Sequence, residues 1–85
     1  MELITEVKKI ICKHAVLDID ESELNINTDL VGDLGINSIS LILIIIDLEE
    51  KFEISIDEDE VDFNLLTEFK YLNDTVERLV KMKEN

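Results

Sequence analysis

The chain has 85 residues, of which 46% are hydrophobic and 34% are charged, and its formal net charge at pH 7 is −13. A charge of this sign and size excludes a nucleic-acid partner, because a phosphate backbone would repel it. The length is that of one small domain, residues 1–85, with room for a modest core but not for a deep catalytic cleft as well.

The composition also predicts the fold class and the compartment. The chain has no proline and only two glycines, which favours an all-helical fold. The single cysteine, Cys12, has no disulfide partner and is expected to be a small buried hydrophobe. The longest uncharged run, Leu34 to Ile46, has 13 residues, too few to cross a bilayer as a helix. We therefore expect a cytoplasmic monomer with no membrane association and no signal peptide.

Apolar residues recur at helical spacing near the start and predict a first helix from about Glu2 to Val16. The only histidine, His14, lies on this apolar stripe and is expected at the edge of the core. Residues 18–37 follow as a long connection, whose spaced apolar residues should hold it against the core. These are Leu24, Ile26, Leu30, Leu34 and Ile36.

The second helix is expected from about Ser38 to Glu53, with Ser38 as its N-cap or first-turn residue. It is apolar almost all round, which predicts that one side packs in the bundle and another stays exposed as a candidate partner contact. The side expected to face the bundle consists of Ile39, Ile42, Ile45, Ile46 and Phe52. The other apolar residues are Leu41, Leu43, Ile44 and Leu48.

Two further elements complete the predicted bundle. Asp57 to Val61 is expected to form one helical turn, with its acids at the positive end of the helix dipole. A last amphipathic helix, capped by Asn73 or Asp74, carries Val76 on its apolar face. The expected fold is an all-α bundle of three longer helices and one short helix, with a long loop between the first two.

The acids are unevenly distributed. Residues 18–62 hold fifteen of the twenty-one acids and a single base, Lys51. Such a surface can simply keep a small protein in solution, or it can steer the protein toward basic patches on partners. The position of the acids around Ser38 favours the second interpretation.

A motif precedes the second helix: Asp33-Leu34-Gly35-Ile36-Asn37-Ser38. It places a serine between a tight glycine turn and an apolar helix that ends in Glu49-Glu50-Lys51-Phe52, at a helix N-terminus that favours an attached phosphate. With the helix order, length and charge, this motif resembles acyl carrier proteins over almost the whole chain.

The resemblance implies an acyl-carrier-like four-helix bundle in which Ser38 carries a 4′-phosphopantetheine arm donated by coenzyme A. A separate phosphopantetheinyl transferase, using magnesium, would attach the arm. Acyl groups held as thioesters would then be presented to acyl-loading and acyl-using enzymes with basic or apolar docking patches. The implied docking residues are Asp33, Leu34, Asn37, Ile39, Ser40, Leu43 and Asp47.

The sequence departs from the family pattern at two places. Asn37 stands where the family has aspartate before the serine, and Ser40 and Leu43 stand where fatty-acid-synthesis carriers have acids. Partner contacts should therefore be more apolar, as in peptidyl or polyketide carriers. We expect a specialised pathway rather than housekeeping fatty acid synthesis.

Three alternatives remain. A free-standing aminoacyl or peptidyl carrier has the same arm and fold, and an unmodified acidic adaptor would use Ser38 only as a cap. A hydrolase is disfavoured because a serine nucleophile needs an oriented base, and His14 lies on the apolar stripe. The acidic runs at residues 18–23 and 57–62 do not match a calcium loop, so no dedicated metal site is expected.

Overall fold

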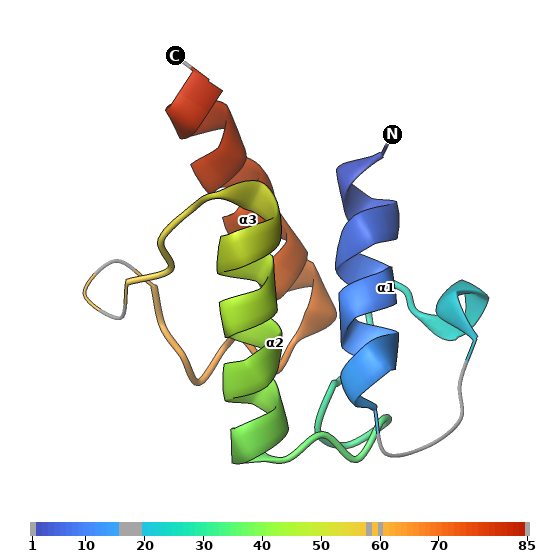
Figure 1. Cartoon of the computed structure of the whole chain (residues 1–85). Helices are drawn as coiled ribbons and strands as arrows, with labels where there is room; N and C mark the ends of the chain where they lie inside the picture. The colour runs from blue at the N-terminus through green and yellow to red at the C-terminus, as the bar shows by residue number, and fades with distance from the viewer. Residues whose placement is uncertain (1, 16–19, 58, 60, 85) are drawn as a thin grey trace.

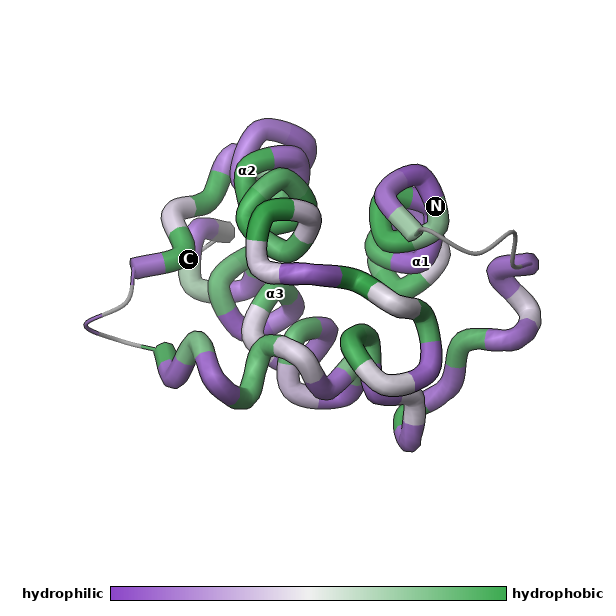
Figure 2. Tube along the Cα trace, turned by 90° about the horizontal axis from the view of Figure 1, so that it is seen from below, coloured by the Kyte–Doolittle hydropathy of each residue, from purple (hydrophilic) through white to green (hydrophobic). Residues whose placement is uncertain are grey.

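A computed structural model describes residues 2–15, 20–57, 59 and 61–84. It contains three α-helices, α1 (Leu3–His14), α2 (Ser38–Phe52) and α3 (Phe69–Glu84), and one 3₁₀ turn, η1 (Glu21–Glu23). Figures 1 and 2 show α1 and α2 alongside each other, with α3 lying across both. The described residues contain no strand and only an isolated bridge between Asp29 and Glu68. The predicted all-helical fold is confirmed.

One hydrophobic cluster joins the three helices and the long loop. Each helix contributes fully buried side chains, such as Ile11 from α1, Ile44 from α2 and Phe69 from α3. The loop residues predicted to hold the connection against the core are buried, with the exception of Ile26, which is 60% exposed. The full set is Val7, Ile11, Leu24, Leu30, Leu34, Ile36, Ile44, Ile45, Leu48, Ile56, Val61, Leu66, Phe69, Leu72 and Val76.

The face that α2 turns to the core differs from the predicted one. Ile44, Ile45 and Leu48 are buried, whereas Ile39, Ile42 and Ile46 are exposed. Two apolar stripes with helical spacing run side by side along this helix, and only the packing against α1 and α3 selects between them. The prediction was right for Ile45 and for Phe52, which is partly buried against the core, and wrong for the three exposed isoleucines.

The N-cap of α2 is Asn37, so the assignment of Ser38 as the cap was wrong and that of a first-turn residue is correct. The Asn37 side chain accepts a hydrogen bond from the Ser40 backbone N–H at 2.8 Å. An asparagine at this position binds an otherwise unpaired N–H of the first turn. At the other end, Glu53 adopts a left-handed conformation with φ 53° and closes the helix.

Helix α3 begins at Phe69, four residues before the predicted cap. The preceding chain is fixed by backbone bonds to the long loop, from Leu30 N–H to the Thr67 carbonyl at 2.7 Å and from Phe69 N–H to the Thr28 carbonyl at 3.0 Å. Asn73 is therefore inside the helix, with 8% of its surface exposed. The helical turn predicted at Asp57–Val61 includes residues 58 and 60, which lie outside the described residues, as does Val16 at the predicted end of α1.

Candidate functional site

Ser38 is the first residue of α2, and its side chain is exposed. Because Asn37 serves as the cap, the Ser38 hydroxyl is not needed to bond the helix backbone. In the described part of the chain it makes no hydrogen bond with another residue. The hydroxyl is thus presented to solvent at the positive end of a 15-residue helix.

The segment before Ser38 is anchored by the two buried residues on either side of Gly35. Leu34 and Ile36 are 4% and 1% exposed, and both belong to the core. Gly35 between them has φ 70°, a left-handed conformation that side chains other than glycine adopt at a cost. The Ile36 N–H donates to the Leu30 carbonyl at 3.1 Å, which closes the turn. This geometry fixes the point at which the chain enters α2.

Two acids of the loop before α2 accept hydrogen bonds from the backbone of the loop itself. Asp29 Oδ1 accepts from the backbone N–H groups of Val31 and Gly32 at 3.0 and 3.1 Å. Asp33 Oδ2 accepts from the Asp29 N–H at 2.9 Å, although the Asp33 side chain remains exposed. Asp33 therefore supports the loop and keeps its second oxygen available on the surface.

The surroundings of Ser38 fit an attached phosphate. The first turn of α2 contains no acid, so no carboxylate of that turn opposes a negative group there. Helix N-termini favour anions through their unpaired N–H groups and the helix dipole. A phosphodiester on the Ser38 oxygen would lie in this favourable field with no residue displaced.

Asp47, one of the expected docking residues, is bound to α1. Its Oδ2 lies 2.6 Å from His14 Nε2 and 3.4 Å from Lys13 Nζ. The hydrogen bond from His14, with the charge of Lys13, lowers the pKa of the Asp47 carboxyl. Asp47 therefore stays ionised and links the two helices.

The same contact separates His14 from Ser38. Asp47 is nine residues along α2 from Ser38, about 13 Å at 1.5 Å per residue. His14, bound to Asp47, is thus placed along the helix and not beside the hydroxyl. The sequence-based argument against a serine hydrolase is consistent with this geometry.

The other predicted docking residues divide into two groups. Asn37, Ile39 and Leu43 are exposed next to Ser38, as is Asp33, while Ser40 is half-buried and Leu34 is buried. Leu34 is therefore part of the core and not of the exposed surface. Sequence reasoning missed Ile42 and Ile46 as surface residues, because it placed them in the core. Their spacing with Ile39 and Leu43 was the available signal.

Lys51, the one base of residues 18–62, also forms an ion pair within the protein. Lys51 Nζ on α2 lies 3.2 Å from Glu6 Oε1 on α1. This bond, more than the nearby Lys9, lowers the pKa of Glu6. Lys51 is therefore paired with an acid outside residues 18–62, and the acids around Ser38 receive little compensation from it.

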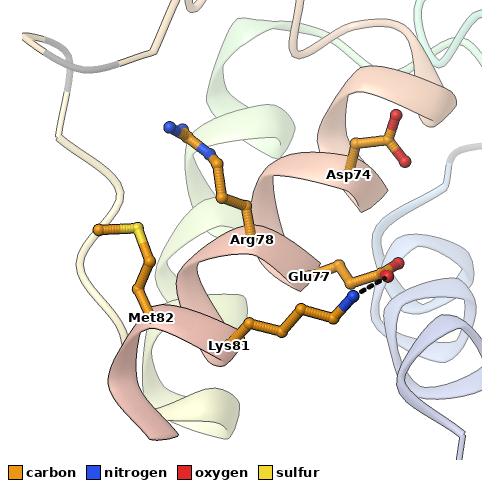
Figure 3. A pocket seen from close by; sticks show the side chains of 5 residues that line it. All are labelled: Asp74, Glu77, Arg78, Lys81 and Met82. Atoms are coloured by element: carbon orange, nitrogen blue, oxygen red, sulfur yellow. Dashed lines mark hydrogen bonds and ion pairs between the residues drawn. The ribbon is translucent and has the colours of Figure 1, made fainter. Parts of the chain in front are cut away.

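An open depression lies on α3, toward the end of the bundle opposite to Ser38. Figure 3 shows its five lining side chains, with Lys81 and Glu77 joined at 3.1 Å and with Arg78 and Met82 directed elsewhere. The nearby Lys83 donates to the Phe52 carbonyl at the far end of α2, which fixes this position. The depression is therefore remote from the serine. Its residues are Asp74, Glu77, Arg78, Lys81 and Met82.

The described residues contain no group of three or more His, Cys, Asp or Glu side chains placed to hold a metal ion. Within the same residues, no helix has the length and apolar character needed to span a membrane. Cys12 is half-buried, and burial is the main reason that its thiol pKa is raised. A raised pKa makes this thiol less reactive as a thiolate.

Comparison with known proteins identifies relatives over most of the chain. Residues 5–81 match the family model described as the phosphopantetheine attachment site. The acyl carrier protein of Desulforapulum autotrophicum is 33% identical over 81 residues, which cover 95% of this chain and 97% of that protein. The acyl carrier protein of Chlamydia caviae is 39% identical over 62 residues, covering 73% and 78%. That of Cyanophora paradoxa is 39% identical over 64 residues, covering 74% of this chain but only 60% of its relative.

Proposed function

Because the chain belongs to the acyl carrier protein family, we propose that Ser38 is the residue that bears its 4′-phosphopantetheine arm. The observation that carries this proposal is the free hydroxyl of Ser38 at the N-terminus of α2, next to a different residue that caps the helix. We propose that residues 1–85 form a single carrier domain.

The residues just before Ser38 keep its hydroxyl exposed and in a fixed place. Asn37 caps the first turn of α2, so the Ser38 hydroxyl is not needed to bond the helix backbone. Gly35 allows the turn between buried Leu34 and Ile36, so the serine is held at a fixed place on the surface. The free N–H groups of the helix start stabilise the negative charge of a phosphate bound there.

The chain itself needs no base. A carrier is modified by a phosphopantetheinyl transferase, and that enzyme takes the proton of the Ser38 hydroxyl. As the serine oxygen bonds to the phosphorus next to the pantetheine, the phosphoanhydride bond of coenzyme A breaks and adenosine 3′,5′-bisphosphate leaves. When attached, the arm supplies the thiol that holds an acyl group as a thioester, while the protein supplies position. This division accounts for a reactive serine without a histidine nearby.

We further propose that the acyl group belongs to a specialised biosynthetic pathway. Asn37 leaves the position before the serine without a charge, and α2 has no acid before Asp47, which is itself bound to His14. Enzymes with strongly basic docking patches gain little from such a surface. The same features suit an aminoacyl or peptidyl carrier, and the two differ only in the loading enzyme. Docking is proposed at Asn37, Ile39, Leu43 and Asp33, with the protein as a monomer.

The test is the intact mass of the protein after incubation with coenzyme A, magnesium and a broad-specificity phosphopantetheinyl transferase. The expected result is one phosphopantetheine on the wild type and none on Ser38→Ala, with Ser55→Ala, a change at an exposed serine beyond the end of α2, modified like the wild type. Modification of Ser38→Ala would place the arm elsewhere. No modification of the folded wild type, repeated with a transferase from the same cell, would support the unmodified adaptor.

A further inference from the structure

The long loop before α2 holds an open depression with a mostly polar lining. Its volume is about 280 Å³, slightly below the range of about 300–1,000 Å³ that is typical of pockets enclosing a drug-sized ligand. The depression therefore has room for a segment of a slender molecule but does not enclose a larger one. Its lining consists of Glu23, Asn25, Asn27, Thr28, Asp33 and Leu34.

Hydrogen bonds within the loop fix the shape of this depression. The Asn27 N–H donates to Asn25 Oδ1 at 2.8 Å, and the Asn25 N–H donates to Thr28 Oγ1 at 2.9 Å. Thr28 is 6% exposed, and its backbone carbonyl accepts from the Phe69 N–H of α3 at 3.0 Å. The lining is thus held by its own bonds and by the helix bundle, without help from a ligand.

Several polar groups of the lining keep unused bonding capacity. In the part of the chain that the structure describes, neither the side-chain NH₂ group of Asn25 nor the side-chain amide of Asn27 makes a hydrogen bond, and the Thr28 hydroxyl donates none. These uncharged donors and acceptors suit the amides and hydroxyl groups of a ligand. Glu23 and Asp33 also accept hydrogen bonds, but their charges oppose an anion. The chemistry of the depression therefore fits a neutral ligand that contains amides.

The depression lies within reach of a group attached to Ser38. Leu34, which belongs to its lining, is four residues before Ser38, so their Cα atoms are at most about 14 Å apart. The bond from the Ile36 N–H to the Leu30 carbonyl folds this segment and shortens the distance. Figure 1 shows the start of α2 and the loop leading into it at the same end of the bundle. An extended phosphopantetheine arm spans about 16 Å from phosphorus to sulfur at standard bond lengths.

We propose that this depression is the resting site of the arm on Ser38, where its pantetheine part lies when no enzyme is bound. The inference rests on the proposed role of Ser38. From its phosphate, the arm carries a dimethyl-substituted carbon, a hydroxyl, two amides and the thiol. Leu34, the lining residue nearest to Ser38 along the chain, offers apolar contact to the dimethyl group, and the loop asparagines and Thr28 offer partners to the hydroxyl and the amides. The phosphate stays at the start of α2, where the helix favours it.

Other surfaces offer the arm less. The large exposed side chains in the first turns of α2 are Ile39, Ile42 and Leu43, which have no hydrogen-bonding group. An amide that leaves water for such a surface loses hydrogen bonds and gains none. The depression on α3 is toward the other end of the bundle, and α2, with 15 residues, is about 22 Å long. That length exceeds the span of the arm.

A weak site is sufficient because the arm is tethered. A short flexible tether holds its ligand at an effective concentration in the millimolar range. A resting site with a Kd of about 1 mM is then occupied about half of the time. Such a site removes the arm from solvent between encounters and still releases it readily to an enzyme.

The experiment compares ¹H–¹⁵N NMR spectra of the whole chain before and after the arm is attached. We expect the side-chain amide signals of Asn25 and Asn27 and the backbone amide signal of Thr28 to shift on attachment. The side-chain amide of Asn64, an exposed asparagine outside the depression, should not shift. Shifts confined to the first turn of α2, next to the phosphate, would overturn the proposal.

Two variants test the bonding groups directly. Asn27→Ala removes the unpaired amide, and Asn25→Asp removes the NH₂ donor while keeping an oxygen for the Asn27 N–H. In each, the shift of the Thr28 amide between the unmodified and modified forms should fall about threefold, as expected when a half-occupied site loses one hydrogen bond. Asn64→Ala, the matched control, should keep the wild-type shift. A wild-type shift in both loop variants would contradict the resting site.

Free pantetheine provides a measurement that does not depend on Ser38. Added to the unmodified chain, it should shift the Asn27 and Thr28 signals with a midpoint in the millimolar range, and the absence of these shifts would overturn the proposal. A chain that is never modified contradicts the role of Ser38 and, with it, the resting site. A chain that is modified normally and shows no shift in the loop contradicts the resting site alone.

Discussion

His14 and Asp47, which lie 33 positions apart, are joined by a contact of 2.6 Å between Nε2 and Oδ2. The contact fastens the last residue of α1 to the middle of α2. The Asp47 carboxylate, which the sequence predicts on the docking surface, therefore also holds α1 and α2 together. Its effect can be measured through stability and its dependence on pH.

Asp47→Asn should lower the free energy of unfolding by about 0.5–1 kcal/mol at pH 7, the range for a partly exposed ion pair. The pKa of Asp47 is lowered in the folded protein, first by the His14 bond and then by Lys13. The carboxylate therefore stabilises the fold above its unfolded pKa of about 4, and this contribution is lost as the pH falls through the lower folded value. Urea denaturation from pH 7 to pH 3 should show the difference between wild type and variant shrinking at the acid end. A difference that grows toward low pH would contradict this assignment.

Ser38→Ala should leave stability almost unchanged while abolishing modification. Because Asn37 and not Ser38 caps α2, the change removes no helix-capping bond, and we expect a difference within about 0.5 kcal/mol. Thermal denaturation and intact mass measure the two effects. A loss of 1 kcal/mol or more, of the size expected for a lost cap, would show that Ser38 does bond the first turn.

Asn37→Ala should destabilise the protein by about 1 kcal/mol, because it leaves the Ser40 N–H without its partner. Asn37→Asp keeps an accepting oxygen and adds a charge that the helix dipole favours, so its stability should equal or exceed that of the wild type. The aspartate variant should also be modified at least as fast by the transferase, since it restores the usual family residue. Chemical denaturation and initial rates of mass gain test the pair. Slower modification of Asn37→Asp would indicate partners adapted to asparagine.

Glu49 anchors the segment after α2 by accepting from the Ile56 N–H at 2.8 Å. Glu49→Ala removes the acceptor from the N–H of buried Ile56 and should cost about 1–2 kcal/mol. Glu49→Gln retains a side-chain oxygen and should cost less than half as much. Hydrogen exchange of the Ile56 amide should accelerate in the alanine variant only. Equal exchange in both variants would mean that the Glu49 bond does not protect this amide.

Ile44→Ala and Ile46→Ala compare two neighbouring isoleucines on opposite faces of α2. Ile44 is fully buried, and its truncation should cost about 2–5 kcal/mol. Ile46 is 42% exposed, and its truncation should cost less than about 1 kcal/mol. Urea melts of the two variants measure the contrast. A larger loss for Ile46→Ala than for Ile44→Ala would place the core face of α2 where the sequence pattern first suggested it.

This pair also shows what the sequence could predict. Composition and periodicity predicted an all-helical chain and the approximate helices, and the glycine–serine motif predicted where α2 starts. The orientation of α2 could not be predicted, because isoleucines and leucines stand on both of its faces and hydrophobicity alone does not distinguish them. The pairing of Asp47 with His14 depends on how α1 packs, and spacing along the chain carries no information on such a contact.

The start of α3 was misjudged for a similar reason. Asn73 and Asp74 are good capping residues, but the helix is begun earlier by buried Phe69 and by backbone bonds to Thr28. The cap of α2 was one residue from the predicted position, because asparagine and serine are both favoured caps and stand next to each other. At the start of α3, local preference was overruled by contacts between distant segments, whereas at α2 the choice lay between two adjacent residues of similar capping preference.

The left-handed turn at Gly35, held between buried Leu34 and Ile36, has a consequence for how cargo would move. Ser38 follows this turn, and the buried side chains on either side of Gly35 hold its backbone in one position. The search of a tethered group for its next enzyme would then come from rotation about the bonds of the tether, starting at the Ser38 Cβ–Oγ bond. The volume swept by the cargo would be centred on one point of the protein, and docking would choose which part of that volume is visited.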